Sequence, residues 1–214
     1  MNFSYANELI LREKNFELAN GRTESTWYLF HNHVFGAAEI ARAVAEKAGM
    51  DTNLAYFSAL LHDIGKIREN REQRFHGVLG YEMLKNENQD VARACLLHTF
   101  PFNRIDSYEK CHKMFFDKKE DYDLTADFIR SHPLSEYDLL VQMADGLANA
   151  YGLVTIEERA QEYAQRHGID VPQDMLSSMH ELKDYFDKKI GCDVYSLFSQ
   201  VATKDVFLSY PVSR

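Results

Sequence analysis

Apolar residues recur along most of the chain at intervals of three or four positions, which is the period of an amphipathic helix. The clearest apolar stripe runs from position 34 to position 48 and ends at Gly49, a residue type favoured just after a helix. A second stripe runs from 54 to 64 and is stopped by Gly65. The pattern predicts helices over about 33–48, 52–64, 77–86, 88–98, 122–131, 135–151, 155–167, 173–189 and 193–201.

The fold class follows from what this pattern lacks as well as from what it contains. No segment alternates apolar and polar residues as a strand does, and only four prolines and ten glycines interrupt the chain. The sequence therefore predicts an all-α fold, and 214 residues are enough for a single domain, 1–214, with a sizeable core. Residues of about 100–133 are interpreted as an inserted segment or lid, because aromatic and charged residues mix there after Pro101.

The balance of charge narrows the classes of function. Lysine and arginine number 24 against 33 aspartates and glutamates, a formal charge of −9, which argues against long nucleic acid as a main partner. A small anionic substrate is compatible with that charge. No apolar run has the length of a membrane span and the N-terminus does not resemble a signal peptide, so no membrane partner is predicted and the expected location is cytoplasmic. Three cysteines without a C-x-x-C pair predict neither a disulfide framework nor a cysteine zinc site.

The dipeptide His62-Asp63 is the most informative chemical feature of the chain. It follows the apolar run AYFSALL and precedes Ile-Gly-Lys, so it is expected where a buried helix ends and opens onto a cavity. Imidazole nitrogen together with carboxylate oxygen suits Mn, Fe, Co, Ni or Zn in an open site with room for water. Asp145 lies amid apolar positions of QMADGLANAY and needs a partner of this kind. His33, expected at the start of the preceding helix, completes the candidate ligands.

The order of these residues resembles a known superfamily. His33, then ALLHDIGK at 59–66, then MADGLAN at 143–149 resembles the HD superfamily of metal-dependent phosphohydrolases, whose signature is H…HD…D on a helical fold. The resemblance covers about 30–151 and implies an HD-domain helical bundle, with the inserted segment and a C-terminal helical extension over 152–214. It also implies that a first metal is held by His33, His62, Asp63 and Asp145. Asp63 would bridge to a second metal where one is present.

Two further histidines extend the resemblance to a dinuclear branch. His76 is expected to open one helix and His98 to close the next, where some HD proteins carry additional metal ligands. The resulting order H…HD…H…H…D is similar to a small HD family that hydrolyses symmetric dinucleoside tetraphosphates and binds two irons. That family has a short link between its last histidine and final aspartate, whereas this chain has a long one between His98 and Asp145. Thr99 also replaces the second histidine of a cyclic-dinucleotide phosphodiesterase branch, so no substrate is carried over.

Other polar and aromatic residues near these motifs have both ordinary and functional interpretations. Lys66 would lie near the metals and hold a phosphate oxygen, or it is solvated after the helix. Asn149 is expected one turn after Asp145, where it would orient that carboxylate. The arginines after the dipeptide are predicted at the surface, the phenylalanines of the insert in the core rather than in a base-stacking wall, and the remaining histidines away from the site. These residues are Arg68, Arg71, Arg74, Phe100, Phe102, Phe115, Phe116, His31, His112, His132, His167 and His180.

The predicted function is hydrolysis of a phosphoester or phosphoanhydride bond by metal-activated hydroxide, which needs no serine or cysteine nucleophile. Asp63 and Lys66 are the predicted catalytic residues, acting on a nucleotide or a similar small phosphorylated substrate. The cofactor is one or two divalent transition metal ions (Fe, Mn, Co, Ni or Zn), with Mg as a further candidate. Two alternatives stay open: a diiron oxygenase with the same ligand order, and a catalytically silent nucleotide-binding module. The C-terminal helices and the acidic segment 117–127 would either cover the site or form the face of a homodimer.

Overall fold

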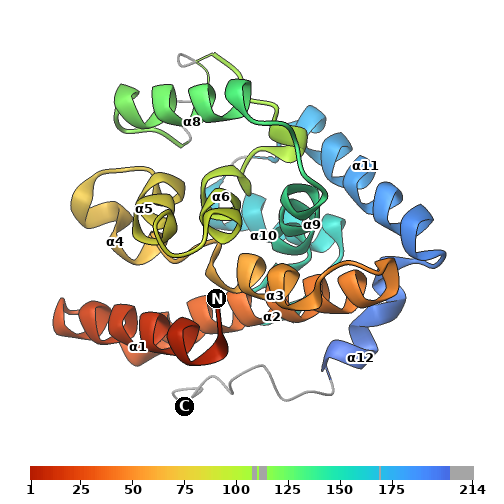
Figure 1. Ribbon diagram of the computed structural model, residues 1–214, viewed down its shortest axis with the longest axis horizontal. Helices are drawn as coiled ribbons and strands as arrows, with labels where there is room; N and C mark the ends of the chain where they lie inside the picture. The colour runs from red at the N-terminus through yellow and green to blue at the C-terminus, as the bar shows by residue number, and fades with distance from the viewer. Residues whose placement is uncertain (108–109, 111–114, 169, 203–214) are drawn as a thin grey trace.

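The computed structural model describes residues 1–107, 110, 115–168 and 170–202, and within these ranges the predicted all-α fold is confirmed (Figure 1). The helices are α1 (Phe3–Ala19), α2 (Glu24–Ala48), α3 (Thr52–Leu61), α4 (Lys66–Glu72), α5 (His76–Leu84), α6 (Gln89–Leu97), α8 (Lys119–Ser131), α9 (Glu136–Gly146), α10 (Ile156–His167), α11 (Gln173–Ile190) and α12 (Phe198–Ala202). Two 3-10 turns, η1 (Pro101–Asn103) and η2 (Val194–Leu197), and two short strands, β1 (Ala148–Asn149) and β2 (Gly152–Leu153), complete the order. None of the described helices is long and apolar enough to cross a lipid bilayer.

The main core lies where α2, α3, α6 and α9 pack together. The long helix α2 buries Ala37, Ala38, Ala41 and Ala45, and such small side chains let neighbouring helices approach closely. Its ends have clear local causes, since the Thr23 side chain caps the start and Gly49 ends it in the left-handed conformation. This packing brings the C-terminal ends of α3, α6 and α9 towards the middle of α2.

The segment predicted as an insert packs on one side of this core. Helix α8 contacts α5 and α6, and Figure 1 shows it above that pair. A second apolar cluster beneath it contains Phe75, Phe100 and Phe116, each at most 3% exposed. The prediction of a core position is therefore confirmed for Phe100 and Phe116, whereas Phe102 and Phe115 are only partly buried.

The apolar pattern did not predict α1 and α4, because charged residues interrupt the apolar stripe in both. Helix α1 buries Glu13 and Glu17 alongside its apolar residues, so its buried face does not stand out as an apolar stripe. Glu13 is neutralised by a two-pronged contact from Arg68, at 2.8 and 3.0 Å. Helix α4 has the sequence KIRENRE and buries only Ile67. Tertiary ion pairing therefore stabilises segments whose local pattern looks solvated.

The prediction of a continuous helix over 135–151 and of a chain without strands is wrong after Gly146. The chain turns back there as a two-residue antiparallel hairpin, β1 with β2. The Asn149 side chain accepts hydrogen bonds from the backbone N–H groups of Tyr151 and Gly152, at 2.8 and 3.0 Å. An amide that closes its own turn competes with helix continuation. The prediction that Asn149 orients Asp145 from the same helix is therefore wrong.

Candidate metal centre

His62 and Asp63 lie in the turn between α3 and α4, as the sequence predicted for the end of a buried helix. His62 is fully buried and Asp63 is 2% exposed. The turn continues through Gly65, where a Cβ would lie 2.1 Å from the backbone oxygen of His76 and 2.6 Å from the backbone nitrogen of Gly80. Only a residue without a side chain lets α5 come this close, and that approach brings His76 against Asp63.

His33 reaches this turn from α2, but not from the start of the helix as predicted. Helix α2 begins at Glu24, so His33 projects from its interior. Its Nδ1 atom lies 3.0 Å from the backbone oxygen of Ala148, and the Asn32 side chain donates to the backbone oxygen of Ala150 at 3.0 Å. The hairpin after α9 thereby fixes the orientation of the His33 ring.

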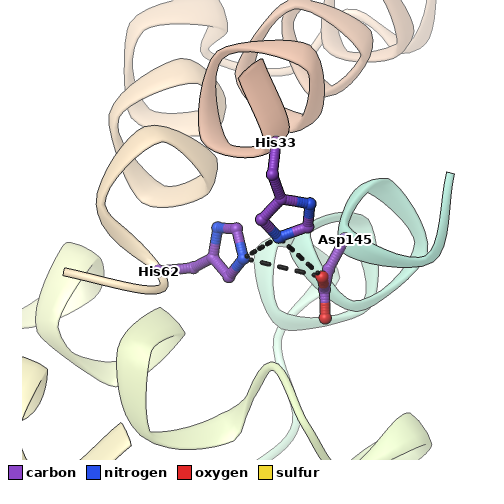
Figure 2. Close-up of side chains that lie close together, drawn as sticks. All are labelled: His33, His62 and Asp145. Atoms are coloured by element: carbon purple, nitrogen blue, oxygen red, sulfur yellow. Dashed lines mark hydrogen bonds and ion pairs between the residues drawn. The ribbon is translucent and has the colours of Figure 1, made fainter. Parts of the chain in front are cut away.

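Side chains from α2, from the turn after α3 and from α9 lie close together (Figure 2). The Nε2 atom of His33 is 3.2 Å from Nε2 of His62 and 3.2 Å from Oδ1 of Asp145, near the end of α9. His62 Nε2 is 3.6 Å from the same carboxylate oxygen. Spacings of this size place the three donor atoms around a common centre, and His33, His62 and Asp145 form a group able to hold a metal ion.

Asp63 connects this group to a second one. Its Oδ2 atom lies 3.5 Å from His33 Nε2 and 3.8 Å from His62 Nε2. Its Oδ1 atom lies 3.3 Å from Nε2 of both His76, which opens α5, and His98, which follows α6. The Nε2 atoms of His76 and His98 are 3.1 Å apart. The six residues predicted from the sequence as metal ligands are therefore brought together, with the Asp63 carboxylate between two sets of imidazoles.

In each histidine ring, the hydrogen-bond partner of Nδ1 determines which nitrogen carries the proton and which has the lone pair. A carbonyl or carboxylate oxygen only accepts, so an Nδ1 atom beside one carries the proton and Nε2 is left as an acceptor. Two such Nε2 atoms 3.1 or 3.2 Å apart repel each other unless a cation lies near them, and Asp63 Oδ1 is buried without a hydrogen-bond partner. The donor set therefore fits divalent metal. The four Nδ1 contacts are His33 to Ala148 O at 3.0 Å, His62 to Ala59 O at 2.6 Å, His76 to Glu69 Oε1 at 2.6 Å, and His98 to Cys95 O at 2.8 Å.

The electrostatics of the cluster keep its carboxylates charged. Burial raises the pKa of Asp63, but the Lys66 ammonium and the imidazoles around the carboxylate outweigh this, and the pKa falls well below its usual range. Burial also raises the pKa of Asp145, but the adjacent His33 and His62 rings outweigh this and bring it well below the usual range. Burial lowers the pKa of His98, which favours its neutral ring. Anionic carboxylates and neutral imidazole are the forms that coordinate metal.

Lys66 lies beside the cluster at the edge of a cavity. Its Nζ atom is 3.2 Å from Asp63 Oδ2, and half of its side chain is exposed. Partial desolvation lowers the pKa of the Lys66 ammonium, but the neighbouring carboxylates of Asp63 and Asp145 raise it by more. The cavity has a volume of about 420 Å³, and Lys66, His76, His98 and Asp145 are among its lining residues. A cation and the candidate metal centre thus face the same space.

Two parts of the site were not predicted from the sequence. Glu69, whose carboxylate contacts Nδ1 of His76, is one of many charged residues in KIRENREQR and had no distinguishing signal. Burial raises the pKa of Glu69 and the hydrogen bond with His76 lowers it by more, so the carboxylate is charged. The other part is which residues of the C-terminal helices reach the site: the sequence left open whether these helices cover the site or form a dimer face, and α10 and α11 form a wall of the cavity.

The remaining histidines and arginines lie where the structure gives them other partners. His31 stacks on Phe35 with ring centroids 4.1 Å apart, and His132 stacks on Phe128 at 4.0 Å. His112 lies outside the described residues, as does the side chain of His167. The other partnerships pair Arg68 with Glu13, Arg71 with Asn20, Arg74 with Asp121 and Glu82, and His180 with Glu157.

Parts of this chain are similar in sequence to known proteins. The family model described as HD domain matches residues 30–150. Ribonuclease Y of Fusobacterium nucleatum is 27% identical over 121 residues, covering 56% of this chain and 23% of that protein. Ribonuclease Y of Clostridium novyi is 28% identical over 155 residues, covering 72% and 29%. A tRNA (cytidine(56)-2'-O)-methyltransferase of Thermoplasma volcanium is 42% identical over 59 residues, covering 28% and 17%. The chain thus spans less than a third of the length of these relatives. No solved structure matches it.

Proposed function

The chain belongs to the HD domain family, and on that premise we propose that it is a metal-dependent phosphohydrolase. Its proposed substrate is a nucleotide or a similarly small phosphorylated molecule, cleaved at a phosphoester or phosphoanhydride bond. One observation carries the proposal: the Asp63 carboxylate lies between two sets of imidazole nitrogens, each within 3.8 Å of one of its oxygens. Buried charge of this kind needs a compensating partner, and a divalent cation provides it.

The proposed ligands divide between two positions. His33, His62, Asp63 and Asp145 would hold one ion, and Asp63 with His76 and His98 a second. A divalent ion bound there would supply a nucleophile from water near neutral pH and offset charge on a phosphate group. Mn, Fe, Co, Ni and Zn suit the mixed nitrogen and oxygen donors, and Mg is a weaker candidate because it prefers oxygen.

The protein's own groups have separate tasks in this proposal. The backbone oxygens and Glu69 that contact the four Nδ1 atoms hold the rings in place, so little reorganisation is needed when a substrate enters. Lys66 presents its ammonium at the cavity edge, where it would hold a phosphate oxygen. The largely apolar remainder of the cavity would reduce the water around the reacting phosphate. Free Cys95 and Cys192 suit a reducing compartment, so we also propose a cytoplasmic location.

The experiment is a hydrolysis assay with p-nitrophenyl phosphate and a nucleotide panel, using protein loaded separately with Mn, Fe, Co, Ni, Zn and Mg. His62→Ala and Asp63→Ala should each lower kcat/KM by at least about a thousandfold, because each removes a donor at the centre of the cluster. His132→Ala is the matched control, since this exposed histidine stacks on Phe128 away from the cluster. Unchanged hydrolysis in the first two variants would refute the mechanism. Substrate-dependent O₂ consumption by iron-loaded protein would instead favour the diiron oxygenase.

RNA is a second candidate substrate, favoured by the relatives named Ribonuclease Y. Its phosphodiester bonds belong to the same bond class as the proposed reaction. The charge of −9 weakens the attraction of a long polyanion, so we rank small phosphorylated molecules first. A short RNA oligonucleotide in the same panel separates the two, since its cleavage with no turnover of mononucleotides would reverse this order.

A further inference from the structure

The cavity beside the candidate metal centre has a wall formed by a different part of the chain. Helices α10 and α11 contribute it, and they follow the region that matches the HD domain family. Most of this wall is apolar. Its apolar residues include Ile156, Ala160, Met175, Leu176 and Met179.

This wall is held firmly against the centre. A Cβ on Gly146, the residue after Asp145, would lie 2.0 Å from the Cε atom of Met179, so α11 packs directly onto the end of α9. The start of α10 is fixed by a capping box between Thr155 and Glu158. The Tyr195 hydroxyl also lies 3.1 Å from the backbone nitrogen of Ile156. The wall and the candidate ligands therefore have a fixed relative position, as a binding site for a defined small molecule requires.

Two arginines also lie on this largely apolar wall. Arg159 and Arg166 are seven residues apart on α10, two helical turns along the same face, and both line the cavity. Arg159 is 26% exposed and Arg166 53%. Glu162 lies between them and pairs with Arg159 at 2.5 Å and with Arg166 at 3.7 Å. Among the described residues these are the ion pairs that the two guanidinium groups make, so one carboxylate faces two cations.

Arg159 and Arg166 are the charged residues that the described parts of α10 and α11 contribute to the cavity lining, although the whole chain carries −9. Arg159 is mostly withdrawn from water, and desolvating a guanidinium is unfavourable unless an anion compensates it. Glu162 uses one guanidinium nitrogen of Arg159, and the planar guanidinium has further N–H donors suited to a carboxylate or phosphate. Because both arginines line the cavity, their remaining N–H donors can bind one more anion there.

We propose that Arg159 and Arg166 bind a second anionic group of the substrate, remote from the phosphate that faces the metal centre. The substrate would then be a small phosphoester whose organic part carries a carboxylate or another phosphate. Met175, Leu176 and Met179 would contact the carbon skeleton between its two charged ends. The assignment of the first charged group rests on the proposed function, whereas binding of the second depends only on the α10 wall.

The test uses three non-hydrolysable probes that share an aromatic core. Benzylphosphonate carries one anionic group, 4-carboxybenzylphosphonate adds a carboxylate at the far end, and p-xylylenediphosphonate adds a second phosphonate. Their dissociation constants are measured by isothermal titration calorimetry with manganese-loaded protein. We expect at least one of the two-ended probes to bind about tenfold more tightly than benzylphosphonate, as for a charge-assisted bidentate contact. The better of the two identifies the second group as carboxylate or phosphate.

Three variants locate the effect on the wall. Arg159→Gln and Arg166→Gln should remove most of the advantage of the two-ended probe and leave benzylphosphonate binding within about twofold. Glu162→Gln should act in the opposite direction and increase that advantage, because it removes the carboxylate that competes for both guanidinium groups. A merely structural role for these residues would not produce opposite signs. Arg130→Gln is the control, since Arg130 pairs with the exposed Asp127 on α8 and does not line the cavity.

The outcomes separate this inference from the proposed function. Equal binding of all three probes to the unaltered protein would overturn the inference, even if metal-dependent hydrolysis is found. A two-ended advantage that Arg159→Gln and Arg166→Gln leave intact would also overturn it. A two-ended advantage that these variants abolish, in a protein without phosphohydrolase activity, would support the inference and count against the proposed function.

Discussion

Glu69 provides the sharpest test of how the second half of the candidate centre works. Its Oε1 atom lies 2.6 Å from Nδ1 of His76, whereas the Nδ1 atoms of the other three histidines of the cluster face neutral backbone oxygens. Glu69→Gln keeps an oxygen acceptor at the same place but removes the negative charge. The His76 ring should then be less polarised and its Nε2 a weaker donor to a metal.

The expected loss of metal affinity in Glu69→Gln follows from the role of Glu69 as the partner of a candidate metal-binding histidine. Changing the group that orients a metal-binding histidine typically costs about 10- to 100-fold in metal affinity, which corresponds to about 1.4–2.8 kcal/mol. The loss should be confined to the position defined by His76, His98 and Asp63. The three residues His33, His62 and Asp145 do not contact Glu69 in the described hydrogen bonds and ion pairs, so binding there should change little.

The assay is a competition titration of metal against a chromophoric chelator, which resolves tight and weak binding steps. One step should keep its affinity in Glu69→Gln while the other weakens by the stated factor. Glu72→Gln is the matched control on the same helix, because Glu72 is exposed and its carboxylate lies 3.9 Å from Arg68. Wild-type affinity at both steps, or equal weakening of both, would refute the assignment of Glu69 to His76.

Three further predictions concern the fold around the centre. Gly65→Ala should lower the free energy of unfolding by about 3 kcal/mol, because its Cβ meets backbone atoms of α5 that cannot yield; a urea-unfolding change below about 1 kcal/mol contradicts this. Burial, aided by Glu39, raises the pKa of Tyr56 to about 12. The folded protein therefore favours the neutral phenol. The resulting stability is lost as pH rises from the pKa of tyrosine in the unfolded chain, about 10, towards 12. In urea unfolding, the protein should lose roughly 1 kcal/mol of stability between about pH 9 and 11 relative to Tyr56→Phe. Burial also raises the pKa of Cys95. In a variant whose other cysteines are changed to serine, Ellman's reagent should therefore react with Cys95 only as fast as the fold opens. Rapid labelling of the native protein would disprove this.

Much of the fold was predictable from local sequence because its causes are local. Gly49 and the apolar stripe before it identify the C-terminal part of α2 without any tertiary information, whereas the start of the helix was predicted at about residue 33 and lies at Glu24. The apolar pattern did not predict a helix whose stability comes from contacts with residues distant in the sequence. Helix α1 buries Glu13 against Arg68, a pairing across 55 positions that no local window contains.

The order of residues along the chain is enough to identify the available chemistry: four histidines and two aspartates in the order H…HD…H…H…D, with His62 and Asp63 at the end of a buried helix. How these groups face one another depends on the packing of the helices. The end of α9 at Gly146 places Ala148 beside His33, and Gly65 lets His76 approach Asp63 closely. Helices α10 and α11 form one wall of the cavity. Helical period and capping depend on neighbours a few residues away, whereas the separation of donor atoms depends on how whole helices pack.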